Sequence, residues 1–114
     1  MTEEEMLHNW DETLLLLDAY EPLLSSSQKE TLSLYFRFNL SLSEIAEEKG
    51  ISRAAASDAL TKGVKKLRHY ESCLGLGKKA KAAKQSIEIL TYADSLDQAK
   101  SALSPLKEAF DDGI

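Results

Sequence analysis

The side chains of this sequence that could do chemistry are mainly basic, and they are concentrated in the middle of the chain. Residues 51–84 hold nine lysines and arginines against two acids, whereas residues 1–50 and 85–114 are acidic and the net charge is −5. These basic groups can bind phosphate locally, because screening at moderate salt removes the distant acidic field beyond about 10 Å. The pattern predicts a nucleic-acid contact within residues 53–84, with solvated helix faces as the alternative.

Seven side chains of this segment have the types and spacing expected for contacts with nucleic acid. An arginine can bind guanine or phosphate, and hydroxyl groups can bind either. The lysines suit backbone phosphates better than base discrimination. Beside them, Ala54 offers only a methyl group and Asp58 would repel phosphate. The candidate nucleic-acid-binding residues are Arg53, Ser57, Thr61, Lys62, Lys65, Lys66 and Arg68.

The groups that could support catalysis or metal binding argue against an enzyme. Cys73 is the only cysteine, and we expect it to be a small buried side chain rather than a nucleophile. His8 and His69 have no sequence neighbours that resemble a catalytic triad, and two histidines with one cysteine cannot supply four zinc ligands. The sequence therefore predicts no catalytic activity, no cofactor and no metal site.

A helix-turn-helix over residues 41–70 would position the candidate side chains. Ser41 and Glu44 have the spacing of a capping box, which would begin a short first helix. Gly50 is expected to end this helix where the turn needs a positive φ, and Ser52 is expected to cap the second helix. The motif would place the candidate residues on that second helix.

Small and aliphatic residues between these caps fit a close helix crossing. Ala46 is expected where the two helices approach, and Ile51 is expected to fill the angle between them. Ala56 and Leu60 would turn the inner face of the second helix towards Ile45 and Leu42. An ordinary helical hairpin is the alternative interpretation.

Two helices are expected before the motif. The first, from about residue 4 to residue 19, would end before Pro22. Its apolar residues recur at three- and four-residue steps and are Leu7, Trp10, Leu14 and Leu17. Ser27 and Glu30 have capping-box spacing and predict the start of the second helix. The side chains that this helix should carry into the core are Leu32, Tyr35, Phe36 and either Phe38 or Leu40.

Further helices are expected after the motif. Gly75 and Gly77 predict a break or bend, and residues 78–114 would then form C-terminal helices, the last of them following Asp94 or Ser95. The dipeptide at 104–105, a serine followed by a proline, predicts a break or kink within the last helix.

The fold expected from these patterns is all-α, a helix-turn-helix bundle of about six helices in a single domain covering residues 1–114. Gly63 is expected to weaken the second motif helix only mildly. The longest apolar run, residues 14–17, is too short to span a membrane, and the acidic residues 3–5 are unlike the start of a signal peptide. These features predict a cytoplasmic protein with no membrane span.

The long run over residues 41–55, Ser-Leu-Ser-Glu-Ile-Ala-Glu-Glu-Lys-Gly-Ile-Ser-Arg-Ala-Ala, resembles the YlxM family of small bacterial proteins. The resemblance includes Tyr35 upstream, Asp58, and the sequence Lys-Leu-Arg-His-Tyr-Glu at residues 66–71, and it covers roughly residues 7–90. It implies a helix-turn-helix similar to the promoter-reading C-terminal domain of bacterial sigma factors. The alanines at 54, 56 and 59 depart from the larger or polar residues usual there, which disfavours sequence-specific DNA reading.

The resemblance also implies a role, because the family is encoded beside components of the signal recognition particle. The chain is accordingly expected to be a regulatory or accessory protein of that pathway that binds DNA or signal recognition particle RNA. The alternative is a protein-interaction module whose helix-turn-helix is only a scaffold. Its partner would be a signal recognition particle protein or a second copy of the chain, as a homodimer. The surface for this alternative would include Ile87, Leu90, Leu96 and Leu103.

Overall fold

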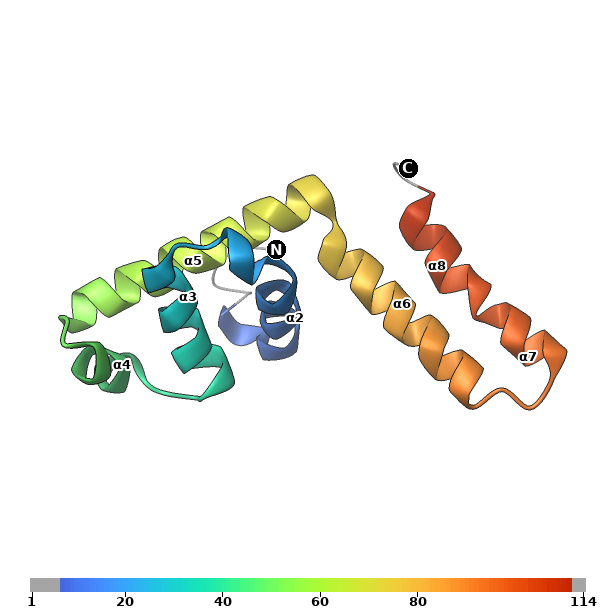
Figure 1. Ribbon diagram of the computed structural model, residues 1–114, viewed down its shortest axis with the longest axis horizontal. Helices are drawn as coiled ribbons and strands as arrows, with labels where there is room; N and C mark the ends of the chain where they lie inside the picture. Colours follow the sequence, from blue (N-terminus) through green and yellow to red (C-terminus); the bar gives the residue numbers. More distant parts are fainter. Residues whose placement is uncertain (1–6, 112–114) are drawn as a thin grey trace. The chain divides into compact units, whose positions relative to one another are not determined.

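The computed structural model describes residues 7–111, which belong to two compact units that divide between Leu74 and Gly75. All regular elements within the described residues are helical, which confirms the all-α class (Figure 1). In chain order they are α2 (Trp10–Tyr20), η1 (Glu21–Leu23), α3 (Ser26–Leu32), η2 (Ser33–Arg37), α4 (Leu42–Lys49), α5 (Arg53–Leu74), α6 (Leu76–Thr91), α7 (Leu96–Ser101) and α8 (Leu103–Phe110). Whether the chain behaves as one domain stays a prediction.

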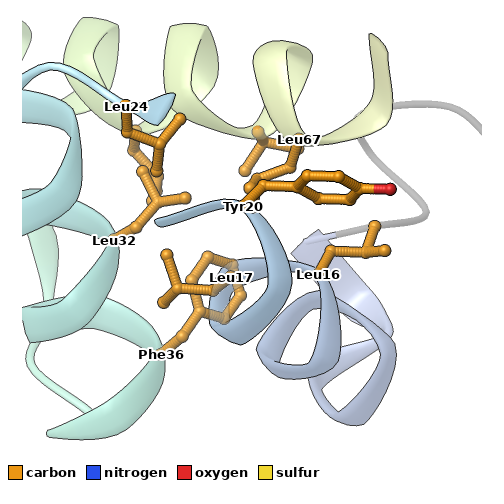
Figure 2. Packing of buried hydrophobic residues seen from close by; sticks show 9 residues of the cluster. Leu16, Leu17, Tyr20, Leu24, Leu32, Phe36 and Leu67 are labelled. Atoms are coloured by element: carbon orange, nitrogen blue, oxygen red, sulfur yellow. The ribbon is translucent and has the colours of Figure 1, made fainter. Parts of the chain in front are cut away.

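The core of the first unit lies between α2, α3 and the long helix α5 (Figure 2). Its fully buried side chains include Leu17 and Tyr20 of α2, Leu32 of α3 and Leu67 of α5. Burying side chains of this size is worth about 1.5–3 kcal/mol each. The core therefore fixes α5 against the N-terminal helices along much of its length.

The first helix is shorter than the sequence pattern predicts, because Asn9 interrupts it. Asn9 has a non-helical backbone (φ −100°, ψ 81°), and the expected start at residues 4–6 lies outside the described residues. The predicted stripe is only partly correct: Leu17 is fully buried, whereas Leu7, Trp10 and Leu14 are half-buried and pack at the edge of the core. The most buried face of α2 includes the two residues Leu16 and Tyr20, which the stripe did not contain. These two residues pack in the same core cluster as the buried residues of α5.

The capping box of α3 lies two residues earlier than predicted. Ser25 is the N-cap: its hydroxyl accepts a hydrogen bond from the Gln28 amide at 3.2 Å, and the Gln28 side chain accepts one from the Ser25 amide at 3.3 Å. The prediction that Ser27 and Glu30 form this box is wrong. Both candidate pairs have the S-x-x-E/Q spacing, and residues 26 onwards are already helical, so the first serine of the run takes the cap.

One turn of π-helix, η2, follows α3 and sets which aromatic and aliphatic residues enter the core. The Phe38 amide donates to the Ser33 carbonyl at 3.2 Å, five residues back, and Asn39 adopts a positive φ of 57°. Phe36 is buried, Phe38 is 68% exposed, and Leu40 packs against the core beside α4. Leu40, not Phe38, is therefore the inward residue of the two that the sequence left open.

The second unit is a helical hairpin in which α6 lies beside α7 and α8 (Figure 1). Gly75, with φ 64°, ends α5 as predicted, but Gly77 lies inside α6. The last helix is divided at Ala102, two residues before the predicted position, so Ser104 is not its N-cap. Pro105 accounts for this break, because its ring nitrogen cannot donate to the Ser101 carbonyl four residues back.

Candidate nucleic-acid interface

The two helices of the predicted motif are α4 and α5, and both predicted caps are present. The Ser41 hydroxyl accepts from the Glu44 amide at 3.1 Å and the Glu44 carboxylate accepts from the Ser41 amide at 3.1 Å. At the start of α5 the Ser52 hydroxyl accepts from the Ala55 amide at 3.0 Å. These bonds fix where both helices begin, as the sequence predicts.

The turn between α4 and α5 is closed by backbone bonds around a left-handed glycine. Gly50 has φ 67° and ψ 35°. The Ile51 amide donates to the Ala46 carbonyl at 2.9 Å and the Gly50 amide donates to the Glu47 carbonyl at 3.3 Å, the two bonds of a Schellman motif. The turn thus depends on glycine, because other residues rarely adopt this conformation.

The helices cross at a small cluster formed by Ile45, Ala46 and Ala56, all buried. This confirms the predicted close approach at Ala46. Ile51, in contrast, is 37% exposed and does not fill the angle between the helices. The turn places its amide inward to bond with α4, and half-buried residues such as Leu40 and Leu42 cover the cluster instead.

Gly63 has a larger structural role than the mild weakness predicted. It is buried in α5 against α3, and a β-carbon at this position would overlap the Leu32 Cδ1 atom. Leu32 is itself fully buried. The absence of a side chain at residue 63 therefore allows α3 to pack closely against the helix that carries the candidate residues.

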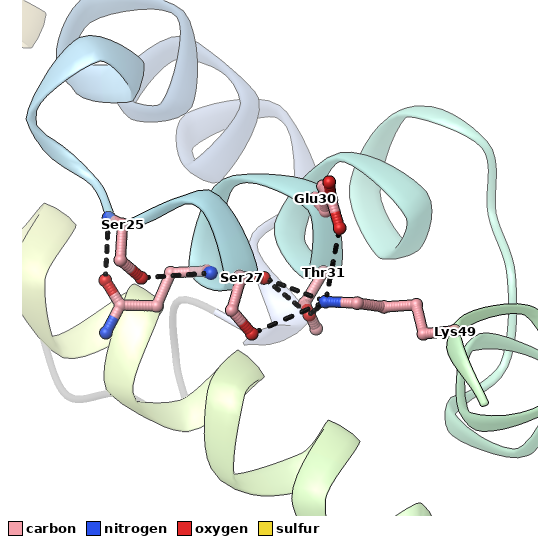
Figure 3. A network of polar contacts seen from close by, with 6 residues as sticks. Ser25, Ser27, Glu30, Thr31 and Lys49 are labelled. Atoms are coloured by element: carbon pink, nitrogen blue, oxygen red, sulfur yellow. Dashed lines mark hydrogen bonds and ion pairs between the residues drawn. The ribbon is translucent and has the colours of Figure 1, made fainter. Parts of the chain in front are cut away.

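Lys49 ties α4 to α3, a function that its sequence position did not reveal (Figure 3). Its ammonium group donates to the Ser27 carbonyl at 3.2 Å and to the Thr31 hydroxyl at 3.1 Å, and it lies 3.6 Å from the Glu30 carboxylate. Only 14% of the side chain is exposed. With the Ser27 hydroxyl at 3.4 Å, four oxygens of three α3 residues therefore hold the end of the first motif helix. Its partners lie about twenty residues away in sequence, so local spacing carries no sign of the contact.

A second ion-pair group joins α2 and η1 to η2. The Arg37 guanidinium binds the Asp18 carboxylate at 2.8 Å and the Glu21 carboxylate at 2.9 Å. The hydrogen bond from Arg37 lowers the pKa of Glu21, and the same bonds raise the pKa of Arg37. These contacts hold α2, η1 and η2 together and lie outside the predicted interface.

The seven predicted contact residues lie on α5, but the helix distributes them over more than one face. Arg53 is exposed in the first turn. With about 100° per residue, Ser57, Thr61 and Arg68 share one half-buried flank, while Lys62 and Lys65 occupy the exposed middle. Lys66 lies on the opposite flank and is half-buried. The outward surface thus has Lys62 and Lys65 at its centre, bordered by the two flanks. Arg53, nine residues before Lys62, lies about half a turn away around the helix and is exposed at its N-terminal end.

Asp58 partly neutralises the positive charge of this surface at Lys62. Its carboxylate lies 3.0 Å from the Lys62 ammonium group, four residues along α5, and both side chains are more than 60% exposed. An exposed pair of this kind is worth less than about 1 kcal/mol, so phosphate can compete for the lysine. The basic character of the outward face increases from Lys65 towards the C-terminal half of α5.

The basic segment continues into the second unit, on α6. Its lysines there are Lys78, Lys79, Lys81 and Lys84. The Lys79 ammonium group lies 5.4 Å from the centre of the Phe110 ring, a cation–π contact within the hairpin. The predicted segment 53–84 is therefore carried by two helices, one in each unit.

Cys73 is exposed, so the prediction that it would be buried is wrong. Its sulfur lies 3.9 Å from the His69 Nε2 atom, one turn back on α5. Position 73 falls on the outward side of the helix, because the inner face is formed by residues such as Val64 and Leu67. Among residues 7–111, no three His, Cys, Asp or Glu side chains are grouped closely enough to hold a metal ion.

The fold and the motif define a helix-turn-helix protein. Comparison with known families agrees: residues 7–106 match the family described as "Putative helix-turn-helix protein, YlxM / p13 like". The match covers most of the sequence, and the chain belongs to this family. Within the described residues, no helix combines the length and apolar character needed to cross a membrane.

Relatives at the level of whole sequences support the assignment. The chain is 38% identical over 94 residues to a UPF0122 protein of Bacillus licheniformis, covering 82% of this chain and 88% of the relative. It is 36% identical over 96 residues to the UPF0122 protein YlxM of Bacillus subtilis, covering 84% and 87%. A UPF0122 protein of Clostridium kluyveri is 38% identical over 89 residues, covering 77% and 80%. The description of the family names a helix-turn-helix protein and no catalytic activity.

Proposed function

We propose that this chain binds nucleic acid through the outward face of α5, chiefly by contacts with backbone phosphates. The observation that carries the proposal is the exposure of Arg53, Lys62 and Lys65 on the second helix of a capped helix-turn-helix. In the usual docking of this motif, the second helix enters the major groove and its first turns approach the bases. The basic residues further along α5 then lie where a nucleic-acid backbone would pass.

Base discrimination by this helix should be weak. Its first two turns present Arg53, two alanines, a half-buried serine and Asp58. Of these, only the arginine can make the bidentate contact that distinguishes guanine. We therefore propose that affinity depends mainly on charge and that preference among sequences is small.

A salt titration of binding tests this proposal. The full chain is titrated against a labelled DNA duplex and against signal recognition particle RNA at several salt concentrations. The logarithm of the affinity should fall linearly with the logarithm of salt, with a slope of about −0.9 per phosphate contacted in DNA. Lys65→Ala should weaken binding to all duplexes alike and reduce that slope by about 1. Lys29→Ala removes a lysine of α3 that lines a cavity with Glu21 and Lys49 and is not among the predicted contact residues. It is the matched control and should leave the slope unchanged.

We also propose an accessory role in the signal recognition particle pathway, in the cytoplasm. The support for this role is the resemblance to the YlxM family, whose genes lie beside those of the particle. DNA and signal recognition particle RNA are both candidate ligands, and the titration above compares them directly. Binding to neither, at salt near 50 mM, would remove the nucleic-acid proposal.

A protein-interaction role is the second candidate, favoured by one observation. The large apolar side chains of the C-terminal hairpin are exposed, among them Ile87, Leu90, Leu96 and Leu103. In this role the helix-turn-helix would be a scaffold, and the partner a signal recognition particle protein or another copy of the chain. Co-purification of the tagged chain with purified particle protein tests the first of these partners.

A further inference from the structure

The C-terminal hairpin uses its small residues to hold itself together. The buried residues of α6 are Gly77, Ala82 and Ser86, and those of α7 and α8 with the residue between them are Ala102 and Ala109. The Ser86 hydroxyl donates to the Ala102 carbonyl across this contact. Small side chains let the helices approach closely but contribute little apolar burial. A hairpin of about forty residues with such an interior lacks the core that independent stability requires.

The large apolar residues of the hairpin form two stripes beside this contact. On α6 the stripe has four- and three-residue steps and consists of Leu76, Ala80, Ala83, Ile87 and Leu90. On α7 and α8 the steps are three and four residues, and the stripe consists of Leu96, Ala99, Leu103, Leu106 and Phe110. Alternating steps of three and four are the pattern of helices that pack side by side in bundles. We name these two stripes together the apolar face.

Both stripes lie on the same side of the hairpin. Helical periodicity places the α6 stripe next to Ser86 on one side, and it places the α8 stripe next to Ala109 on the corresponding side. The contact between Lys79 and Phe110 joins the two helices on this side. On the other side a groove runs between α6 and α8. Its lining is mixed: Ala82, Ile89, Pro105 and Ala109 are apolar, and Lys78, Lys81, Gln85, Ser101, Ser104 and Glu108 are polar. The hairpin thus has both apolar stripes on one side and a groove of mixed lining on the other.

The apolar face is exposed to an extent that is unusual for residues of this size. The exposed fractions are 63% for Ile87, 70% for Leu96 and 65% for Leu103. In the described part of the first unit, by contrast, the exposed large apolar residues Leu23, Phe38, Ile51 and Leu74 lie on four separate segments and form no stripe. Within the described residues, the hairpin is the part of the chain that carries two parallel apolar stripes. The apolar face of a second hairpin would therefore be complementary to it.

We propose that the apolar face is the contact surface for a second copy of this chain, so that two hairpins form a four-helix bundle. Two helices with heptad-like stripes on one face are half of such a bundle, and a two-fold axis makes the surface self-complementary. Charge supports the same occupant. Helix α6 has four lysines and one glutamate, net +3, whereas residues 92–111 have four acids and two lysines, net −2. Pairing α6 of one copy with α7 and α8 of the other places opposite charges side by side.

The decisive measurement is the mass of the full chain in solution. Sedimentation equilibrium or light scattering at 1–100 µM should give about twice the chain mass of 12.6 kDa. The double variant Ile87→Glu with Leu103→Glu places charges on both stripes and should weaken association at least a hundredfold. The control variant Gln85→Glu with Ser104→Glu adds equal charge to the same helices on the side of the groove and should remain dimeric.

Folding is monitored separately so that loss of structure is not mistaken for loss of contact. Trp10 is the only tryptophan and lies in the first unit, where its indole donates to the Phe36 carbonyl at 2.9 Å, so its fluorescence reports that unit alone. The stripe variant should keep this signal while it becomes monomeric. A monomeric wild-type chain, a stripe variant that remains dimeric, or equal disruption by the control variant would each overturn the proposal. None of these results depends on nucleic-acid binding, which is measured independently.

Discussion

At the scale of single residues, two positions determine how the helix-turn-helix packs in the first unit. Gly63 lets Leu32 pack against α5, and Lys49 contacts three residues of α3, Ser27, Glu30 and Thr31. Neither residue belongs to the predicted interface. Both nevertheless determine where α4 and α5 lie, and so where the candidate contact residues are presented.

Gly63→Ala is expected to lower the free energy of unfolding by about 1 kcal/mol. In an exposed helix alanine would be better than glycine by about 1 kcal/mol, but overpacking a buried site costs about 1–3 kcal/mol. Denaturant unfolding followed by Trp10 fluorescence measures the change. Leu32→Ala removes the atom that would be overlapped, so Gly63→Ala should be harmless or stabilising in that background. Stabilisation by Gly63→Ala in the wild-type background would contradict the close approach.

The Arg37 ion pairs predict a pH-dependent contribution to stability. Arg37 lowers the pKa of Glu21 below 4.5, so the stabilisation is present above that pH and is lost as pH falls through the lowered folded-state value. Arg37→Met should therefore cost up to about 1 kcal/mol at pH 7, since the side chains are partly exposed, and less at pH 3. Parallel urea titrations of the two proteins at both pH values give the comparison. A cost that is unchanged at pH 3 would show that the methionine acts through packing.

At the scale of elements, the helix boundaries are set by serine caps, a left-handed glycine and one proline. Ser25, Ser41, Ser52 and Ser95 each accept a backbone amide at the start of a helix, and Gly50 closes the turn of the motif. Each N-cap of this type is worth about 0.5–2 kcal/mol. The element ends are therefore fixed by short-range bonds, whereas the faces that the elements bury are not.

The two serines near the start of α3 should differ in their effect on stability. Ser25→Ala removes the cap of the capping box and is expected to lower the free energy of unfolding by about 1 kcal/mol. Ser27→Ala removes only a hydroxyl 3.4 Å from Lys49, whose ammonium group keeps the Ser27 carbonyl and Thr31, and should cost less than half as much. Thermal and denaturant unfolding of the two variants compares them directly. A larger loss of stability for Ser27→Ala than for Ser25→Ala would instead indicate that Ser27 is the N-cap, as the sequence spacing suggested.

At the scale of the whole molecule, the two units differ in how they are stabilised. The unit that ends at Leu74 encloses a core of large buried side chains. The unit that begins at Gly75 encloses small residues and exposes its large ones, and α7 contains no buried residue. The first unit should accordingly be stable at any protein concentration, whereas the stability of the second should depend on its partner.

Hydrogen exchange should show this difference directly. Amides of α6, α7 and α8 are expected to exchange more slowly as protein concentration is raised through the dissociation constant of the dimer. Amides around Val64 and Leu67 in α5, which are fully buried, should exchange at a rate independent of concentration. Mass spectrometry of peptides at two concentrations tenfold or more apart measures both sets. Equal rates for α6–α8 at every concentration would show that the hairpin is stable without a second copy.

The sequence by itself determined the features that depend on residues close together along the chain. The helical class, the caps at Ser41 and Ser52 and the left-handed turn at Gly50 all follow from spacings of four residues or fewer. The close approach of Ala46 and Ala56, ten residues apart, follows from these caps and the turn between them. Hydrogen bonds in caps and turns, and the steric limits on φ, act over this range, so the sequence pattern is sufficient to predict them.

Tertiary structure alone decided the features that depend on partners far along the chain. The contact of Gly63 with Leu32, the acceptors of Lys49, and the exposure of Ile51 and Cys73 cannot be read from local spacing. The same holds for the apolar stripes of the hairpin, because a three- and four-residue pattern shows that a helix has an apolar face but not what covers it. Which face is buried depends on which helices meet, and that is settled by packing over the whole unit.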